Sequence, residues 1–268
     1  MEQSFEPMTD EELILLKVKN INETDGKLDE TDGYNCEKCR NKGYIMKAVL
    51  RDGNWQEVMC DCVCKPTRAT IRRMKRSGLK DIIRDYTFAK YEAAEDWQRK
   101  LKDAASQYAE NPHGWFFVGG QSGAGKTHLC TAICRELLLR GKEVRYMLWR
   151  DDIIKLKSSV NDASVYEPLM DSYKRCEVLY IDDLFKTGKS ADGTRQQPTS
   201  ADIHTAFEIL NFRYNNPGLL TIISSECTVA EIIDIDEATG GRIFERAAAF
   251  SLKPDKKKNY RLKGVTEL

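Results

Sequence analysis

Residues 115–127 read Trp-Phe-Phe-Val-Gly-Gly-Gln-Ser-Gly-Ala-Gly-Lys-Thr, and this stretch decides the fold class of the chain. Its first four residues are an apolar run of β-forming side chains, typical of a buried strand. The next nine contain the spacing G-x-x-x-x-G-K-T, and a helical pattern then extends from Leu129 to Arg140. A glycine-rich loop of this spacing between a strand and a helix is typical of a phosphate-binding loop. The stretch therefore predicts an α/β domain that binds a nucleotide.

Each residue type in this loop has a chemical reason. Glycines allow backbone N–H groups to turn toward a phosphate, and the start of the following helix adds positive potential. Lys126 is expected to reach the β- and γ-phosphates, and the hydroxyl of Thr127 to bind Mg²⁺. A glycine loop that binds no phosphate is the alternative. The predicted nucleotide-binding residues are Gly120, Gln121, Ser122, Gly123, Ala124, Gly125, Lys126, Thr127 and His128.

Two adjacent acids follow a second apolar run. Residues 177–181 read Glu-Val-Leu-Tyr-Ile, a pattern typical of a strand buried on both faces of a parallel sheet, and Asp182 and Asp183 come directly after it. Open α/β sheets bind ligands at the carboxyl ends of their strands. Asp182 is therefore the candidate partner of Mg²⁺, and Asp183 the candidate that orients or deprotonates an attacking water. The competing interpretation is that the pair caps a helix.

The remaining strands alternate with helices. Residues 143–149 and 219–225 are rich in β-forming side chains, and a helix is predicted over residues 200–214. This alternation predicts a parallel sheet covered by helices on both faces. The last of these strands ends in Ser224 and Ser225, whose hydroxyls could sense the γ-phosphate or cap the next turn.

Five of the nine cysteines are clustered near the N-terminus. Cys36 and Cys39 form a C-x-x-C pair, a hairpin is expected over residues 43–54, and a second group of cysteines follows. Two such pairs can close a tetrahedral zinc site, and a metal would supply the stability that a lone hairpin lacks. An unmetallated or redox-active cluster is the alternative. The predicted ligands are Cys36, Cys39, Cys62 and Cys64, with Cys60 as the rival choice in the second group.

The formal net charge of zero conceals blocks of opposite sign. The chain has 42 basic and 42 acidic residues, but residues 1–35 hold ten carboxylates against three lysines. Residues 65–84 hold eight basic residues against one acid, and residues 253–263 hold six against one. Either basic block could contact the phosphates of a nucleic acid. A solvated linker helix is the alternative for the first.

A short amphipathic helix is predicted over residues 9–20, where Thr9 and Glu12 can form a capping box. A polar stretch over residues 20–35 follows and is interpreted as a tether. The helix is therefore either a docking element on a tether or an element packed within its own domain.

Two further classes are excluded. The longest apolar runs, such as residues 178–181 and 219–223, are far shorter than the roughly 20 residues of a membrane helix, so no membrane partner is predicted. The N-terminus, Met-Glu-Gln-Ser-Phe-Glu, lacks the basic and apolar regions of a signal peptide. We therefore expect a cytoplasmic location.

Taken together, these motifs resemble those of the AAA+ ATPases of the DnaC/DnaI helicase-loader group, close to the IstB transposition helpers. The resemblance rests on the phosphate-binding loop, the strands at 178–184 and 221–225, and the segment 241–246, Gly-Arg-Ile-Phe-Glu-Arg. Gram-positive and phage-type loaders also carry an N-terminal cysteine-rich zinc element. The resemblance implies a three-layer αβα parallel sheet with ATP, Mg²⁺ and Zn²⁺ as cofactors. It also implies no C-terminal lid domain, since only 18 residues follow Phe250.

The resemblance implies roles for three further residues. Arg246 is similar to the arginine finger that completes the ATP site of a neighbouring subunit, and Arg242 is a second candidate one helical turn earlier. Surface ion pairs are the alternative for both. Ser225 is the candidate sensor of the γ-phosphate, although Glu226 stands where the family often has Asn.

The resemblance also implies an organisation and a function. Residues 1–66 are predicted to be a helicase-binding helix and zinc domain, 67–110 a basic linker and helix, and 111–268 the AAA+ ATPase domain. Hydrolysis of ATP would depend on self-assembly into a ring or spiral, and the protein would deliver a replicative DnaB-type helicase onto single-stranded DNA. The polar loop over 186–195 could reach that DNA, with disorder without function as the alternative. The alternatives are an IstB-like transposition helper and a nucleotide-gated DNA-binding adaptor with little hydrolysis.

Overall fold

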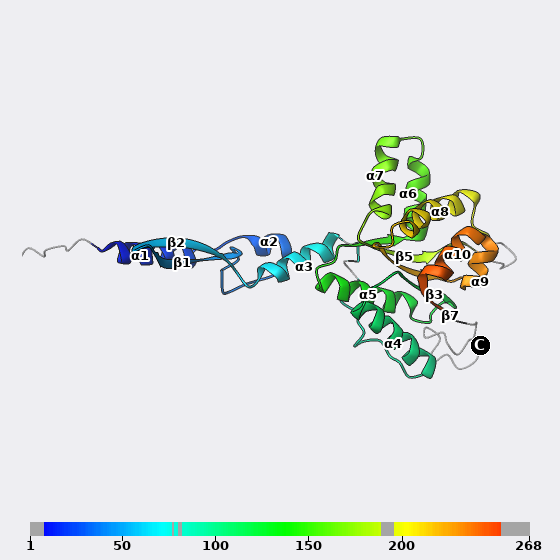
Figure 1. The fold of residues 1–268 in the computed structure, drawn as a ribbon, viewed down its shortest axis with the longest axis horizontal. Coiled ribbons are helices and arrows are strands. Elements are labelled where there is room, and N and C mark those ends of the chain that lie inside the picture. Colours follow the sequence, from blue (N-terminus) through cyan, green and yellow to red (C-terminus); the bar gives the residue numbers. More distant parts are fainter. Residues whose placement is uncertain (1–7, 77, 80–81, 189–195, 253–268) are drawn as a thin grey trace, which may run out of the picture. The chain divides into compact units, whose positions relative to one another are not determined.

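The computed structural model describes residues 8–76, 78–79, 82–188 and 196–252. The chain forms two compact units, Met1–Arg72 (the N-terminal unit) and Arg73–Leu268 (the ATPase unit; Figure 1). No described helix is both long enough and apolar enough to cross a membrane. Most of the predicted DNA-reaching loop and all of the basic block at 253–263 lie outside the described residues. The domain boundaries at 66/67 and 110/111 remain predictions.

The N-terminal unit is built on a β-hairpin. β1 (Tyr44–Arg51) and β2 (Asn54–Asp61) pair antiparallel along their whole length, as the sequence predicts. Asp52 and Gly53 form the two-residue turn with φ of +50° and +77°, the left-handed conformations typical of a tight hairpin turn. The basic helix α3 (Lys65–Arg76) begins soon after β2.

The first helix, α1 (Asp10–Glu23), packs on this hairpin. The side chain of Asn22 donates a hydrogen bond to the carbonyl of Met46 and accepts one from its N–H, both at 2.9 Å. An asparagine amide can thus pair with the β1 backbone as a neighbouring strand would. The predicted tether over residues 20–35 is therefore wrong, because α1 continues to Glu23 and a short helix, α2 (Leu28–Asp32), follows.

The ATPase unit contains a five-stranded parallel sheet in the order β4, β5, β6, β3, β7. Parallel neighbours cannot be joined by hairpins, so the chain crosses over the sheet between them. The edge strand β7 is not predicted from the sequence, because its start, Ala-Ala-Ala, lacks β-branched residues. The strands are β3 (Trp115–Gly120), β4 (Val144–Leu148), β5 (Val178–Leu184), β6 (Leu220–Ser225) and β7 (Ala247–Leu252).

Side chains of this sheet alternate between two faces that helices cover. On β3, Phe116 and Val118 belong to one buried cluster, whereas Trp115 and Phe117 belong to the other. The first face packs against α4 and α5, and the second against α6 to α10 (Figure 1). These helices are α4 (Asp96–Glu110), α5 (Lys126–Leu139), α6 (Trp149–Ser159), α7 (Ala163–Lys174), α8 (Ser200–Tyr214), α9 (Val229–Ile235) and α10 (Glu237–Arg246). The three-layer αβα fold is therefore confirmed, with no helical lid among the described residues.

Arg213, in the last turn of α8, is a fully buried cation that the sequence does not single out. Its guanidinium donates to the carbonyl oxygens of Tyr173, Lys174 and Cys176 at 2.9–3.1 Å, and to that of Leu220 at 2.6 Å. Burial lowers the pKa of Arg213. These hydrogen bonds join the end of α7 to the start of β6. They therefore stabilise the amino-terminal ends of the strands, and the phosphate-binding loop lies at the carboxyl ends.

Candidate nucleotide and metal sites

The phosphate-binding loop joins β3 to α5 at the carboxyl ends of the strands. Gly120, Gly123 and Gly125 have φ between +77° and +111°, and Gly125 is the N-cap of α5. A Cβ atom on Gly125 would lie 2.7 Å from the ring of Tyr91, so both the backbone conformation and the packing require glycine there. The loop borders a cavity of about 340 Å³, within the usual size range of small-molecule sites.

Lys126 is 6% exposed and lines this cavity. Its ammonium donates to the carbonyl oxygens of Gly120 at 2.8 Å and Gln121 at 2.7 Å. Burial lowers the pKa of Lys126, and the negative charges of Asp183 and Glu226 only partly oppose this effect. A buried cation at the start of a helix is well placed to attract a phosphate group.

Asp182, near the end of β5, is hydrogen-bonded to the phosphate-binding loop. The hydroxyl of Thr127 donates to its Oδ1 at 3.1 Å, so the two predicted magnesium ligands are adjacent. Tyr180 donates to the same oxygen at 2.7 Å, as does Ser224, and Tyr146 donates to Oδ2 at 3.0 Å. Carboxylate and hydroxyl oxygens are ligands that Mg²⁺ prefers, so the residues present fit this ion.

Asp183 faces the cavity beside two charged residues. Lys186 contacts its Oδ2 at 2.8 Å and Oε1 of Glu226 at 3.2 Å, and all three line the cavity. Burial opposes the charge of Lys186, but its bonds to both acids raise its pKa. Asp183 has a φ of +59°, a left-handed conformation that is uncommon outside glycine. The predicted water-orienting acid therefore lies in the cavity, and Lys186 is a cavity residue that the sequence does not reveal.

The two serines of β6 have structural partners. The hydroxyl of Ser225 donates to the carbonyl of Leu184 at 2.7 Å and accepts from the N–H of Cys227 at 3.0 Å. This geometry is that of the turn-capping alternative. The hydroxyl of Ser224 accepts from the backbone N–H of Asp183 at 3.0 Å and donates to Oδ1 of Asp182. Among the described residues, the polar group that lines the cavity from this side is Glu226 rather than either serine.

Three rings, those of Tyr86, Tyr91 and His128, also line the cavity and are called the aromatic wall below. The ring of Tyr86 stacks on that of His128 with centroids 4.8 Å apart, and Tyr91 meets His128 edge-on at 5.3 Å. Nε2 of His128 lies 2.8 Å from the carbonyl oxygen of Thr87. Burial raises the pKa of Tyr91 to about 12, and its buried hydroxyl has no hydrogen-bond partner within the described part of the chain. A nucleotide, with a planar base and many polar groups, fits such a wall.

The two candidate arginine fingers lie on α10, outside the lining of this cavity. The guanidinium of Arg246 lies 4.7 Å from the ring centroid of Tyr214 and donates to its carbonyl oxygen at 3.2 Å. Arg242 stacks on Phe207 at 4.9 Å and hydrogen-bonds Asn211 at 3.1 Å. Among the described residues their partners are rings and neutral oxygens rather than the carboxylates of the ion-pair alternative.

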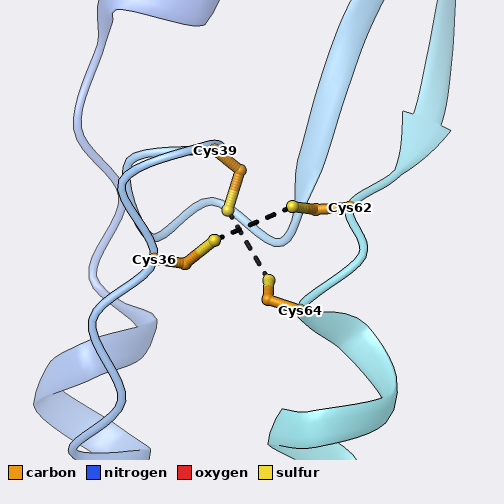
Figure 2. A group of neighbouring side chains, drawn as sticks. All are labelled: Cys36, Cys39, Cys62 and Cys64. Carbon is orange, nitrogen blue, oxygen red and sulfur yellow. Dashed lines mark hydrogen bonds between the residues drawn. The ribbon is translucent and has the colours of Figure 1, made fainter.

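Four cysteines converge in the N-terminal unit (Figure 2). The Sγ atoms of Cys36 and Cys62 are 3.8 Å apart, and those of Cys39 and Cys64 are 3.7 Å apart. Four sulfur atoms about 2.3 Å from a central zinc ion at the corners of a tetrahedron would be about 3.8 Å from one another. All four are buried, whereas Cys60 lies within β2 and outside the group. The donor set therefore fits zinc, with the four predicted cysteines brought together.

The thiols of Cys39, Cys62 and Cys64 differ in pKa. Burial raises the pKa of Cys62, and raises that of Cys64 to about 12. Burial also opposes ionisation of Cys39, but a hydrogen bond from the N–H of Gly43 and bonds with the other thiols lower its pKa to about 7. Metal ligands must be thiolates, so a bound cation would be needed to ionise the whole group.

Arg68 of α3 is buried beside the cysteines. Its guanidinium contacts Asp32 at 2.6 Å, with both side chains 2% exposed, and donates to Asn41 at 2.9 Å. Burial alone would lower the pKa of Arg68, but the hydrogen bond to Asp32 raises it. This member of the basic block therefore holds the N-terminal unit together, and its guanidinium is not available to a nucleic acid.

Comparisons with known proteins show which sequences this chain is similar to. A family model described as IstB-like ATP binding protein matches residues 59–234. The phage-like element PBSX protein XkdC of Bacillus subtilis (strain 168) is 29% identical over 253 residues, which cover 87% of this chain and 88% of that protein. The replicative helicase loader DnaC of Escherichia coli (strain K12) is 32% identical over 117 residues, which cover 42% of this chain and 48% of DnaC.

Solved structures share the fold at lower identity. The crystal structure of the DnaC helicase loader matches with a TM-score of 0.53 and 19% identity, over 65% of this chain and 99% of that one. The crystal structure of DnaI matches with a TM-score of 0.51 and 21% identity, over 64% of this chain and 92% of that one. The ATPase unit therefore has the P-loop AAA+ fold.

Proposed function

This chain belongs to the IstB-like ATP-binding protein family, and from that membership we propose that it binds ATP with Mg²⁺ and hydrolyses it. The observation that carries the proposal is the 3.1 Å hydrogen bond from Thr127 to Asp182, made next to a phosphate-binding loop that borders a cavity. Mg²⁺, when bound there, neutralises negative charge that develops on the phosphates.

The residues of the cavity divide the chemistry among them. Lys126 exchanges its bonds to the loop carbonyls for bonds to phosphate oxygens, while the loop N–H groups hold the same phosphates. Thr127 and Asp182 hold the magnesium ion. Asp183, which faces the cavity, orients the attacking water and accepts its proton.

Replacement of Asp183 tests hydrolysis separately from binding. Asp183→Ala is expected to lower the rate of ATP hydrolysis at least about 100-fold, the usual contribution of a positioned base, and to leave ATP binding in place. Asp151→Ala, at an exposed position of α6, is the matched control and is expected to change neither. An Asp183→Ala variant that keeps the wild-type rate would favour the nucleotide-gated adaptor.

We propose further that the protein loads a replicative DnaB-type helicase onto single-stranded DNA. The names of the similar proteins support this proposal, because DnaC of Escherichia coli is a replicative helicase loader and XkdC comes from a phage-like element. The cysteine-rich N-terminal unit is the part we assign to helicase binding. The IstB-like family match favours the second candidate, a transposition helper ATPase.

A pull-down with the co-encoded replicative helicase distinguishes the two candidates. The loader proposal predicts that the full chain captures the helicase, and that capture with ATP differs between the wild type and Lys126→Ala. Failure of the wild type to bind the helicase, with binding to a co-encoded transposase instead, would favour the transposition helper. The proposed action on single-stranded DNA is tested separately. The protein should be retained more strongly on immobilised single-stranded DNA than on immobilised double-stranded DNA.

We propose that Arg246 completes the ATP site of a neighbouring copy of the chain. Arg246→Ala would then lower hydrolysis by about 1000-fold or more in the assembled protein, as loss of an arginine finger does. Mixing Arg246→Ala with Lys126→Ala should restore part of the rate, because one copy supplies an intact site and the other an intact finger. Arg175→Ala, which removes a guanidinium stacked 4.9 Å from Phe212, is the matched control. A monomer with the full wild-type rate would contradict the proposal.

A further inference from the structure

Two tyrosine hydroxyls converge on Asp182 and have no role in the function proposed above. Tyr146 of β4 and Tyr180 of β5 lie opposite each other in the parallel pair, with ring centroids 5.2 Å apart. Tyr146 donates to Oδ2 of Asp182 at 3.0 Å, and Tyr180 donates to Oδ1 at 2.7 Å. The two neighbouring strands therefore hold the two oxygens of one carboxylate.

The distribution of donors fixes how this carboxylate is turned. Oδ1 accepts from Thr127, Tyr180 and Ser224, whereas Oδ2 accepts from Tyr146. Asp182 is 3% exposed, so water has little access to replace a lost donor. Groups that hydrogen-bond a metal ligand set its orientation and its affinity for the metal, and their loss usually weakens metal binding 10- to 100-fold.

The backbone at Gly78 lies near Tyr146. A Cβ atom added to Gly78 would lie 3.5 Å from Cβ of Tyr146, an ordinary van der Waals distance. Gly78 has a φ of +86°, which a larger residue would adopt only with strain. Tyr146 therefore has the backbone at Gly78 as a neighbour and the carboxylate of Asp182 as its hydrogen-bond partner.

We propose that Tyr146 and Tyr180 are positioning residues for the magnesium ion, and that they hold Asp182 turned toward Thr127. The inference rests on the proposed binding of ATP with Mg²⁺. It assigns to the buried phenol of Tyr180 and the half-buried phenol of Tyr146 a role in magnesium affinity that is separate from contact with the nucleotide.

The test compares nucleotide binding with and without magnesium. A fluorescent ATP analogue is titrated in EDTA, and then at fixed analogue concentration with increasing Mg²⁺, for the full-length wild type and for Tyr146→Phe. In Tyr146→Phe, we expect the Mg²⁺ concentration that gives the half-maximal change in analogue binding to be 10- to 100-fold higher than in the wild type. The affinity of this variant for the analogue in EDTA should stay within twofold of the wild-type value. Tyr166→Phe is the matched control, since it removes a hydroxyl bonded to Glu208 at 3.3 Å on another part of the unit.

The outcomes separate the inference from the function on which it rests. Suppose that the wild type shows magnesium-dependent binding of the analogue and that Tyr146→Phe is folded with the same Mg²⁺ dependence. That result overturns the role of the tyrosines and leaves the proposed binding of ATP with Mg²⁺ intact. A wild type that shows no magnesium-dependent binding overturns the proposed function as well. Tyr180→Phe carries the same expectation through the other oxygen, so the inference remains testable if one variant does not fold.

Discussion

The two units of the chain differ in how their candidate site is related to the buried core. In the ATPase unit, two large clusters of buried side chains cover both faces of the sheet. They position Lys126 and Asp182 at the carboxyl ends of its strands. Among residues 8–72 of the N-terminal unit, the buried cluster consists of the four cysteines, with Tyr34 and Ile45 packed against it, and α1 has no buried residue. The nucleotide site thus depends on a core that exists without it, whereas the cysteine site is itself the core.

Removal of one cysteine should give the largest effect. Cys39→Ser is expected to abolish metal binding and to unfold the N-terminal unit, because a structural zinc site contributes about 10–16 kcal/mol to small domains. Cys60→Ser is the matched control, since Cys60 lies outside the group. Metal content by elemental analysis and amide hydrogen exchange of residues 8–72 measure the effect, while exchange in the sheet should stay unchanged. Metal lost in Cys60→Ser but retained in Cys64→Ser would reverse the ligand assignment.

The buried ion pair in the same unit should give the next effect. Arg68→Ala leaves Asp32 buried without its guanidinium, which costs about 3–5 kcal/mol for buried pairs. Because the unit has little other core, we expect a large loss of its stability and a weaker hold on the metal. Arg72→Ala, one turn later on α3 and exposed, is the matched control. Chemical unfolding followed by hydrogen exchange in residues 8–72 measures the difference. Equal stabilities for the two variants would show that the pair contributes little.

The nucleotide site should respond without loss of fold. Lys126→Ala removes a charge-assisted contact to phosphate, which corresponds to about 10- to 100-fold in ATP affinity. The thermal midpoint of the ATPase unit should stay constant or rise, because burial disfavours the charged form of Lys126. Lys142→Ala, which removes a partly exposed contact to Glu177, is the control. Equilibrium binding of ATP and thermal unfolding are measured on the same samples, and an unfolded Lys126→Ala would contradict the comparison between the units.

Sequence patterns predicted those parts of the molecule that are contiguous or regularly spaced. The loop ending in Lys126 and Thr127, the strand before Asp182 and the C-x-x-C pair each carry their chemistry within a few neighbouring residues. The structure brings these residues together as that reasoning expected. The hydroxyl of Thr127 hydrogen-bonds Asp182, and the Sγ atoms of the four cysteines lie within 4.8 Å of one another. Local spacing is sufficient there because the fold class fixes which strand ends meet.

Contacts between distant segments were not predictable in this way. Arg68 belongs to a basic block on the sequence, but its burial depends on Asp32, which lies 36 residues earlier. The hydroxyl of Tyr146 reaches Asp182 from a neighbouring strand whose pairing register no local pattern fixes, and the stacking of Tyr86 on His128 joins residues far apart in the chain. Strand β7 forms because β3 offers a free edge. Each of these depends on tertiary pairing rather than on periodicity.

The smallest expected effect uses two helix caps of the same design. Thr9 of α1 and Thr228 of α9 each accept from the N–H of a glutamate three residues later, and each glutamate accepts in return from the threonine N–H. Thr228→Ala is expected to cost the ATPase unit about 1 kcal/mol of unfolding free energy, as loss of a cap does. The cost should appear in global unfolding, because α9 buries Val229 and Ile232 in the core of that unit.

Thr9→Ala should instead act only locally. Since α1 buries no residue, loss of its cap is expected to raise amide exchange in the first turn of α1 and to leave metal content unchanged. The hydrogen bond from the Thr9 N–H lowers the pKa of Glu12, so this cap contributes above the ordinary pKa of Glu12 and is lost as the pH falls through the lowered value. Protonation of Glu12 in acid should therefore lower the protection of this turn against exchange in the wild type, while the bond from the Glu12 N–H to the Thr9 hydroxyl stays in place. If Thr9→Ala releases the metal, α1 is part of the core that holds the cysteines, and the contrast between the two units is weaker than we infer.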